Sequence, residues 1–225
     1  MAVNKVDFEV KEKEIVCLIG PNGAGKTTVF NIITGSFTSD AGKVYFLGQD
    51  ITGQKPEDVC LKGLGRTFQV VKPFGKLSVF KNIMVGALLR TKSFKLAEEK
   101  TLRILEQVDL IKYKDAMAQS LPIGLKKRLE LARVLATEPK MLCLDEVLGG
   151  LTNIEVTHMI KFIKNLRNSG LTILMVEHVM SAVMALSDRI IVLNNGQKLA
   201  EGTPEEIAKD PKVIEAYLGE GYHAS

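Results

Sequence analysis

Apolar and charged residues alternate along residues 6–10, where the sequence reads VDFEV. This spacing predicts a strand with one face buried. Residues 15–19 are continuously apolar, which is typical of a strand that is covered on both faces. Residues 44–47 predict a further strand, and the polar residues 48–50 close it with a turn. The beginning of the chain therefore predicts a sheet.

Helical spacing replaces these strands over residues 70–139, where apolar residues recur every three or four positions. Strand patterns return at residues 140–144 and 171–176, and an amphipathic helix over residues 156–166 separates them. The alternation of strand and helix predicts an α/β core that is interrupted by a helical lobe.

The last part of the chain predicts a hairpin and a helical tail. Residues 189–193 and 197–201 have strand character, and Asn194, Asn195 and Gly196 lie between them. An Asn-Gly pair favours the positive φ angles of a tight turn, so the two strands should pair antiparallel. Beyond residue 202 the pattern is mostly that of amphipathic helices.

Composition agrees with one soluble domain. The 225 residues are 46% hydrophobic and 25% charged, and no apolar run approaches the roughly 20 residues of a membrane span. We see no apolar leader after Met1, and we expect Cys17 and Cys143 to be inert core residues of a cytosolic protein. The net charge of +4 is a weak indication of an anionic ligand and does not by itself indicate nucleic acid.

The strongest chemical motif is GPNGAGKTT, which follows the predicted strand 15–19 and precedes a helical pattern. Glycine-rich turns of this kind direct backbone N–H groups at phosphate oxygens, and the helix N-terminus adds partial positive charge. Lys26 can then reach the β- and γ-phosphates, while the Thr27 hydroxyl can bind Mg²⁺. The predicted phosphate-binding residues are Gly20, Pro21, Asn22, Gly23, Ala24, Gly25, Lys26, Thr27 and Thr28.

Two carboxylates end the predicted strand 140–144. We expect Asp145 to hold Mg²⁺ through water and Glu146 to polarise the attacking water. Adjacent carboxylates are more often a solvated strand end, but an apolar strand downstream of a phosphate loop favours the functional interpretation. Gln69, where the helical lobe begins, can reach both the metal and the water.

Two further segments narrow the chemistry. His178 follows the predicted strand 171–176 at its carboxyl end, where open α/β sheets place ligand contacts, and we expect it to contact the γ-phosphate. Three cations, Lys126, Lys127 and Arg128, stand at the start of a predicted helix, where anions are normally preferred. We therefore expect this cluster to face an anionic ligand or a partner.

With these sites in this order, essentially the whole chain from Val3 onward resembles an ATP-binding subunit of an ABC transporter. The tail, with AEGTPEE and PKVIEAYLG, resembles subunits of branched-chain amino acid importers. The resemblance implies a P-loop NTPase fold with a RecA-like core and an antiparallel β-subdomain. The implied core comprises residues 1–69 and 140–225, and the implied helical subdomain comprises residues 70–139.

The resemblance also implies partners. Two such subunits, identical or paralogous, pack head to tail, and each ATP lies between the phosphate loop of one and the signature segment of the other. That segment is Leu121, Pro122, Ile123, Gly124 and Leu125 here. The dimer drives two membrane permeases, which implies a place at the cytoplasmic face of the cell membrane, an indirect partner in a solute-binding protein, and no nucleic acid.

Three departures from the family pattern bear on activity. The usual signature LSGGQ is LPIGL here, and Pro122 lacks both the serine hydroxyl and a backbone N–H. Val147 and Thr152 replace a proline and an aspartate that are common in the following loop. The loop differences bear on coupling across the dimer. The altered signature, together with the missing adenine contact described next, leaves open an alternative, a nucleotide-binding interaction or regulatory subunit with little hydrolysis.

The third departure concerns the adenine. Family members carry an aromatic residue that stacks on the base, upstream of the segment that begins here at Ala2. Phe8 is a poor substitute, because its alternation points it into the core. We therefore expect that residues precede Met1 in the native protein.

Overall fold

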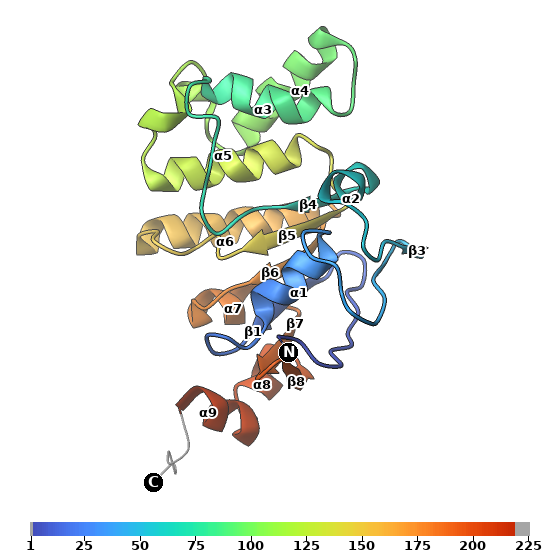
Figure 1. Ribbon diagram of the computed structural model, residues 1–225. Coiled ribbons are helices and arrows are strands. Elements are labelled where there is room, and N and C mark those ends of the chain that lie inside the picture. Colours follow the sequence, from blue (N-terminus) through green and yellow to red (C-terminus); the bar gives the residue numbers. More distant parts are fainter. Residues whose placement is uncertain (1, 219–225) are drawn as a thin grey trace.

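The computed structural model describes residues 2–218 and contains a six-stranded sheet with helices on both faces (Figure 1). The strands are β1 (Ile15–Ile19), β4 (Leu64–Arg66), β5 (Met141–Asp145), β6 (Thr172–Val176), β7 (Arg189–Asn194) and β8 (Gln197–Gly202). Their spatial order is β4-β5-β6-β1-β7-β8. All neighbouring pairs are parallel except β7 and β8, which are antiparallel. The expected α/β class is confirmed.

The parallel strands are apolar because both faces of the sheet are covered. Every residue of β1, β5 and β6 is buried. Successive side chains of a strand point to opposite faces, so Ile15, Cys17 and Ile19 pack into one apolar cluster while Val16 and Leu18 pack into another. Burial raises the pKa of the thiols of Cys17 and Cys143, which agrees with the expectation that they are inert.

The helices stack in layers around the sheet (Figure 1). They are α1 (Lys26–Ile33), α2 (Pro56–Lys62), α3 (Val79–Leu88), α4 (Phe94–Gln107), α5 (Ile123–Leu135), α6 (Asn153–Asn168), α7 (Met180–Leu186), α8 (Pro204–Ile207) and α9 (Pro211–Leu218), with short 3₁₀ turns at Ile111–Tyr113 and Ala118–Ser120. Between β4 and β5 the structure has helices α3, α4 and α5, which pack on one another, as the helical spacing predicted. None of the helices within residues 2–218 is both long and apolar enough to cross a bilayer.

The expected strand at residues 6–10 is wrong. The segment is extended and its residues alternate between half-buried and exposed, with Phe8 packed against the core as anticipated. A strand also requires a hydrogen-bonded neighbour, however, and within the described residues this segment lacks the repeated backbone bonds of a ladder. The Glu9 carbonyl instead accepts a bond from Arg189 Nη2.

The predicted turn at Asn195 and Gly196 is confirmed, whereas the turn expected over residues 48–50 lies at Leu47 and Gly48, and Gln49–Asp50 form a strand. Asn195 and Gly196 have φ angles of 47° and 76° between β7 and β8, which is the geometry that an Asn-Gly turn favours. A two-stranded sheet of β2 (Tyr45–Phe46) and β3 (Gln49–Asp50) replaces the single strand expected at 44–47, because Leu47 and Gly48 turn the chain back with φ of 50° and 74°.

Candidate nucleotide-binding site

The carboxyl ends of four neighbouring parallel strands bring the predicted residues to one edge of the sheet. The loop of residues 20–28 follows β1, Gln69 follows β4, Asp145 ends β5, and His178 comes shortly after β6. Parallel strands share the direction of their ends, so segments far apart in the sequence meet there. This is the edge at which open α/β sheets bind ligands.

Residues 20–25 form the turn between β1 and α1, and residues 26–28 are the first residues of α1. Gly20, Gly23 and Gly25 have φ angles of 150°, 81° and 101°, a region that L side chains rarely adopt. A Cβ at Gly25 would lie 2.7 Å from the main-chain oxygen of Ala2. No side chain caps α1 and its first turn carries no acidic residue, so the helix N-terminus is available to an anion.

Lys26 folds its side chain over this loop. Its Nζ donates hydrogen bonds to the main-chain oxygens of Gly20 (2.7 Å) and Pro21 (2.9 Å). Burial lowers the pKa of Lys26, and the negative charge of Glu146 opposes that shift. The ammonium group is therefore held at the mouth of the loop, where a phosphate oxygen can replace the two carbonyls.

Glu146, Gln69 and His178 converge from three different loops. Gln69 Nε2 donates a hydrogen bond of 2.7 Å to Glu146 Oε2, and His178 Nδ1 lies 3.7 Å from the same oxygen. Glu146 has a φ of 49°, which is uncommon for a residue other than glycine and marks a backbone held in place by its surroundings. The structure thus brings together the three residues for which a catalytic role was predicted.

Asp145 is bound to Arg66, a residue to which the sequence analysis gave no role. Arg66 Nη2 donates to Asp145 Oδ2 at 3.0 Å, and its other terminal nitrogen donates to Asn31 Oδ1 (2.7 Å) on α1 and to Thr34 Oγ1 (2.8 Å) at its C-cap. Burial raises the pKa of Asp145, and the guanidinium opposes that rise. Arg66 therefore ties β4, β5 and the helix after the phosphate loop together.

Glu177 is a second buried carboxylate that the sequence analysis did not single out. It is 1% exposed, and its Oε1 accepts a hydrogen bond of 2.9 Å from the backbone N–H of Leu148. Burial raises the pKa of Glu177. Its position directly after the apolar strand β6 was a signal available in the sequence, but a single glutamate beside a histidine gave no reason to expect this bond.

The signature segment, residues 121–125, does not reach the phosphate loop of its own chain. It begins α5, where Pro122 and Ile123 are exposed and Gly124 is packed against the carboxylate of Glu155 at the start of α6. Glu155 and Thr152 form a capping box on α6, so Thr152 has a structural role in place of the common aspartate.

The cations after the signature segment have partners within the chain. Lys127 is buried, and its Nζ donates a bond of 2.9 Å to the Glu146 carbonyl oxygen. Arg128 pairs with Asp109 at 3.4 Å. The expectation that this cluster faces an external anion or a partner is thus wrong for Lys127, because the fold places an acceptor of its own opposite that buried group. For Arg128 the expectation stays a prediction.

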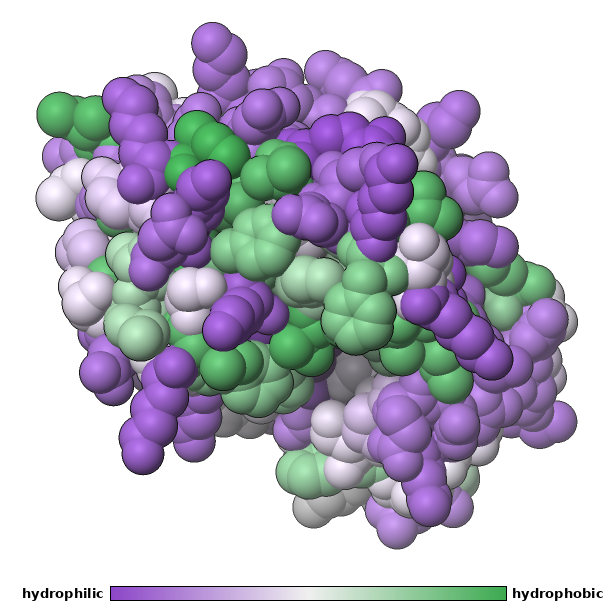
Figure 2. All heavy atoms as spheres, turned by 90° about the horizontal axis from the view of Figure 1, so that it is seen from above, coloured by the Kyte–Doolittle hydropathy of each residue, from purple (hydrophilic) through white to green (hydrophobic). Residues whose placement is uncertain are grey.

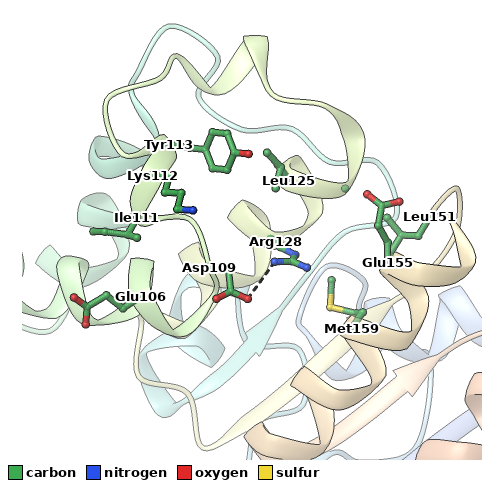
Figure 3. Close-up of a pocket in the computed structure, with 11 residues that line it drawn as sticks. Glu106, Asp109, Ile111, Lys112, Tyr113, Leu125, Arg128, Leu151, Glu155 and Met159 are labelled. Carbon is green, nitrogen blue, oxygen red and sulfur yellow. Dashed lines mark hydrogen bonds and ion pairs between the residues drawn. The ribbon is translucent and has the colours of Figure 1, made fainter.

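A cavity of about 450 Å³ lies beside the signature segment (Figure 3). Its lining residues are Glu106, Asp109, Ile111, Lys112, Tyr113, Gly124, Leu125, Arg128, Leu151, Glu155 and Met159. The Asp109–Arg128 pair points into it, and both carboxylates and cations line it (Figure 3). No phosphate-loop residue contributes to this lining, so it is separate from the edge described above.

Comparisons with known proteins agree with this geometry. The profile of the ABC transporter family matches residues 3–149, and that of the branched-chain amino acid ATP-binding cassette transporter matches residues 197–223. The high-affinity branched-chain amino acid transport ATP-binding protein LivG of Escherichia coli is 42% identical, over 98% of this chain and 92% of its own. BraF of Pseudomonas aeruginosa, named for the same transport, is 39% identical with the same coverage.

Solved structures give the same answer. A nucleotide-free ATP-binding cassette from an ABC transporter superposes with a TM-score of 0.88, at 33% identity over 97% of this chain and 93% of the other. The ADP conformation of an ATP-binding cassette superposes with a TM-score of 0.87, at 33% identity and the same coverage. With the phosphate loop and its facing carboxylates in place, this chain belongs to the ATP-hydrolysing, ATP-binding subunits of ABC transporters, in the group of branched-chain amino acid importers.

Proposed function

We propose that the chain hydrolyses Mg²⁺-ATP at the edge formed by residues 20–28, Gln69, Asp145, Glu146 and His178, and that this reaction drives import of a branched-chain amino acid. The observation that carries the proposal is the meeting of Gln69 and Glu146 beside the phosphate loop. The names of the relatives from Escherichia coli and Pseudomonas aeruginosa support the class of solute.

The donors fit a magnesium ion. Thr27, Gln69 and Asp145 supply a hydroxyl, an amide and a carboxylate oxygen, the hard ligands that Mg²⁺ prefers. Within residues 2–218 no group of three or more His, Cys, Asp or Glu side chains gathers as a metal cage. Mg²⁺ commonly completes its shell with phosphate oxygens and water, and when bound it neutralises charge on the β- and γ-phosphates.

The remaining residues act on the nucleotide and the water. The amides of residues 20–28 and the Lys26 ammonium bind phosphate oxygens. Glu146 orients and polarises the attacking water, and Gln69 fixes its carboxylate by the 2.7 Å bond. The His178 side chain is exposed, and its Nδ1 lies 3.7 Å from Glu146 Oε2. In this proposal it contacts the γ-phosphate.

The signature segment acts on the nucleotide of a second cassette, identical or paralogous, packed head to tail. The cavity of Figure 3 supports this arrangement, since Gly124 and Leu125 line it and no phosphate-loop residue of the same chain does. Gly124 keeps a backbone N–H for the partner's γ-phosphate, whereas Pro122 has none to give. We therefore expect a contact weaker than that of the usual LSGGQ segment.

A membrane partner docks beside the loop that holds Gln69. In this proposal residues 70–139 form a helical subdomain, and the rest of the chain forms the core. Exposed apolar side chains are interspersed with charged ones on the face that the helices form (Figure 2). Those near the junction are Phe68, Val70, Phe74, Val85, Leu88 and Leu89, which are 36–65% exposed. Exposed apolar groups of this kind mark protein contacts, here with two permease subunits at the cytoplasmic face of the membrane.

Reconstitution tests the proposal. The chain would be co-purified with its membrane subunits and second cassette, placed in vesicles with a solute-binding protein, and assayed for ATP-dependent uptake of radiolabelled leucine, glutamate and a sugar. We expect uptake of leucine with Mg²⁺-ATP and none after Lys26→Ala. ATP hydrolysis with uptake of another solute in place of leucine would overturn only the assignment of a branched-chain amino acid. Absence of ATP hydrolysis would overturn the proposed catalytic site.

A further inference from the structure

Helix α5 carries two buried charged side chains one turn apart. Lys127 is 8% exposed and Glu130 is 7% exposed, on the helix that begins with the signature segment. Buried charges are costly unless hydrogen bonds satisfy them. Among the described residues neither one forms a side-chain ion pair within 4.0 Å; each is hydrogen-bonded to a main-chain group of another element.

Lys127 holds the backbone of Glu146. Its Nζ donates to the Glu146 carbonyl oxygen at 2.9 Å, in the same residue whose φ of 49° requires outside support. Burial lowers the pKa of Lys127, and the negative charges of Glu177, Glu130 and Glu146 favour its cationic form. The bond is therefore charge-assisted, which makes it stronger than a neutral one.

Glu130 holds the residue before Gln69. Its Oε1 accepts a hydrogen bond of 3.0 Å from the backbone N–H of Phe68. Gln69 in turn donates to Glu146 Oε2. Helix α5 thus binds the main chain on both sides of the Gln69–Glu146 bond, at the Phe68 N–H and at the Glu146 carbonyl. A displacement of α5 would shift the two side chains relative to each other.

The geometry points to Lys127 and Glu130 as positioning residues that set the Gln69–Glu146 pair according to the position of the signature helix. This inference rests on the roles proposed above for Gln69, Glu146 and the signature segment. Because that segment serves the partner's nucleotide, α5 couples the two ATP sites of a dimer: its contact with one ATP sets the catalytic geometry around the other.

Two variants that separate the reach of the side chain from its charge test Glu130 in the assembled transporter. Glu130→Gln keeps an acceptor oxygen at the same length, whereas Glu130→Asp keeps the charge but is one methylene too short for Phe68. We expect Glu130→Asp to lower kcat about tenfold and to change KM for ATP less than about twofold. Glu130→Gln should retain most of the wild-type kcat. Lys127→Met should lower kcat similarly with the same small change in KM.

A double-mutant cycle distinguishes positioning from general destabilisation. If Glu130 acts through Gln69, Glu130→Asp should change kcat less than about twofold once Gln69→Ala is present. Thr101→Val is the control, because its buried hydroxyl donates to the Ala97 carbonyl of the same helix, α4; it should lower the thermal midpoint and leave kcat unchanged. Wild-type kcat in Glu130→Asp, equal losses of kcat and ATP affinity, or additivity with Gln69→Ala would each overturn the inference. Unchanged hydrolysis in Gln69→Ala alone would instead count against the proposed site.

Discussion

Gln69 Nε2 donates a hydrogen bond of 2.7 Å to Glu146 Oε2, and this bond joins the loop after β4 to the loop after β5. It orients the carboxylate toward the edge where the phosphate loop lies. Glu146→Gln keeps the shape of the side chain but removes its basicity. We expect turnover of ATP to fall at least about a hundredfold, as for loss of a general base. Binding of a fluorescent ATP analogue should be retained, and near wild-type hydrolysis would rule out this role for Glu146.

Arg66 neutralises Asp145 inside the protein, with both side chains less than a tenth exposed. Arg66→Met leaves a buried carboxylate without its partner, which should lower the free energy of unfolding by about 3–5 kcal/mol in urea titrations. Adding Asp145→Asn should recover part of that loss. Arg128→Met is the matched control, because its partner Asp109 is 83% exposed and such pairs contribute about 0–1 kcal/mol. Equal losses in the two arginine variants would contradict this account.

Substitution of Gly25 tests whether the backbone of the phosphate loop binds ATP. Gly25→Ala combines a φ of 101° with a Cβ 2.7 Å from the Ala2 oxygen, so the loop must move. We expect affinity for Mg²⁺-ATP to fall at least about tenfold by calorimetry. Gly170→Ala has a similar φ of 105° with open space around its Cβ, and should cost about 1 kcal/mol of stability without changing affinity. An unchanged affinity in Gly25→Ala would contradict phosphate binding by this loop.

Glu130 predicts a pH dependence of stability. Burial raises the pKa of Glu130 from 4.5 to about 7; the Phe68 N–H, Arg133 and Lys127 oppose that rise, and Asp145 adds to it. The folded state therefore binds more protons than the unfolded state between these two values, so this residue's contribution to the free energy of unfolding falls as pH rises through that range. Glu130→Gln removes the titration.

The free energy of unfolding of Glu130→Gln, relative to wild type, should accordingly rise between about pH 5 and pH 8, by up to about 3 kcal/mol. Urea unfolding at several pH values measures it. Glu138→Gln is the control, since that carboxylate is more than half exposed and pairs with Lys100 at the surface. A difference between Glu130→Gln and wild type that stays constant across this range would contradict the raised pKa of Glu130.

The sequence by itself determined the strands β1, β5 and β6, because strands covered on both faces must be apolar throughout. It also determined the phosphate loop, since the glycines at residues 20, 23 and 25 are needed for backbone angles that are local. Polar residues after apolar strands predicted that Glu146 and His178 would lie at one edge, because parallel strands end at the same side of a sheet. Gln69 was expected to reach the same site, but the short strand β4 that precedes it was not predicted.

Only the tertiary structure decided which charged groups face one another. Arg66 and Asp145 belong to adjacent strands that are far apart in the sequence, and Lys127 binds a carbonyl rather than an external anion. Residues 6–10 have the alternation of a strand but no ladder of backbone bonds. Periodicity reports which face of a segment is buried, whereas hydrogen bonds and ion pairs depend on distances that arise only when separate elements pack.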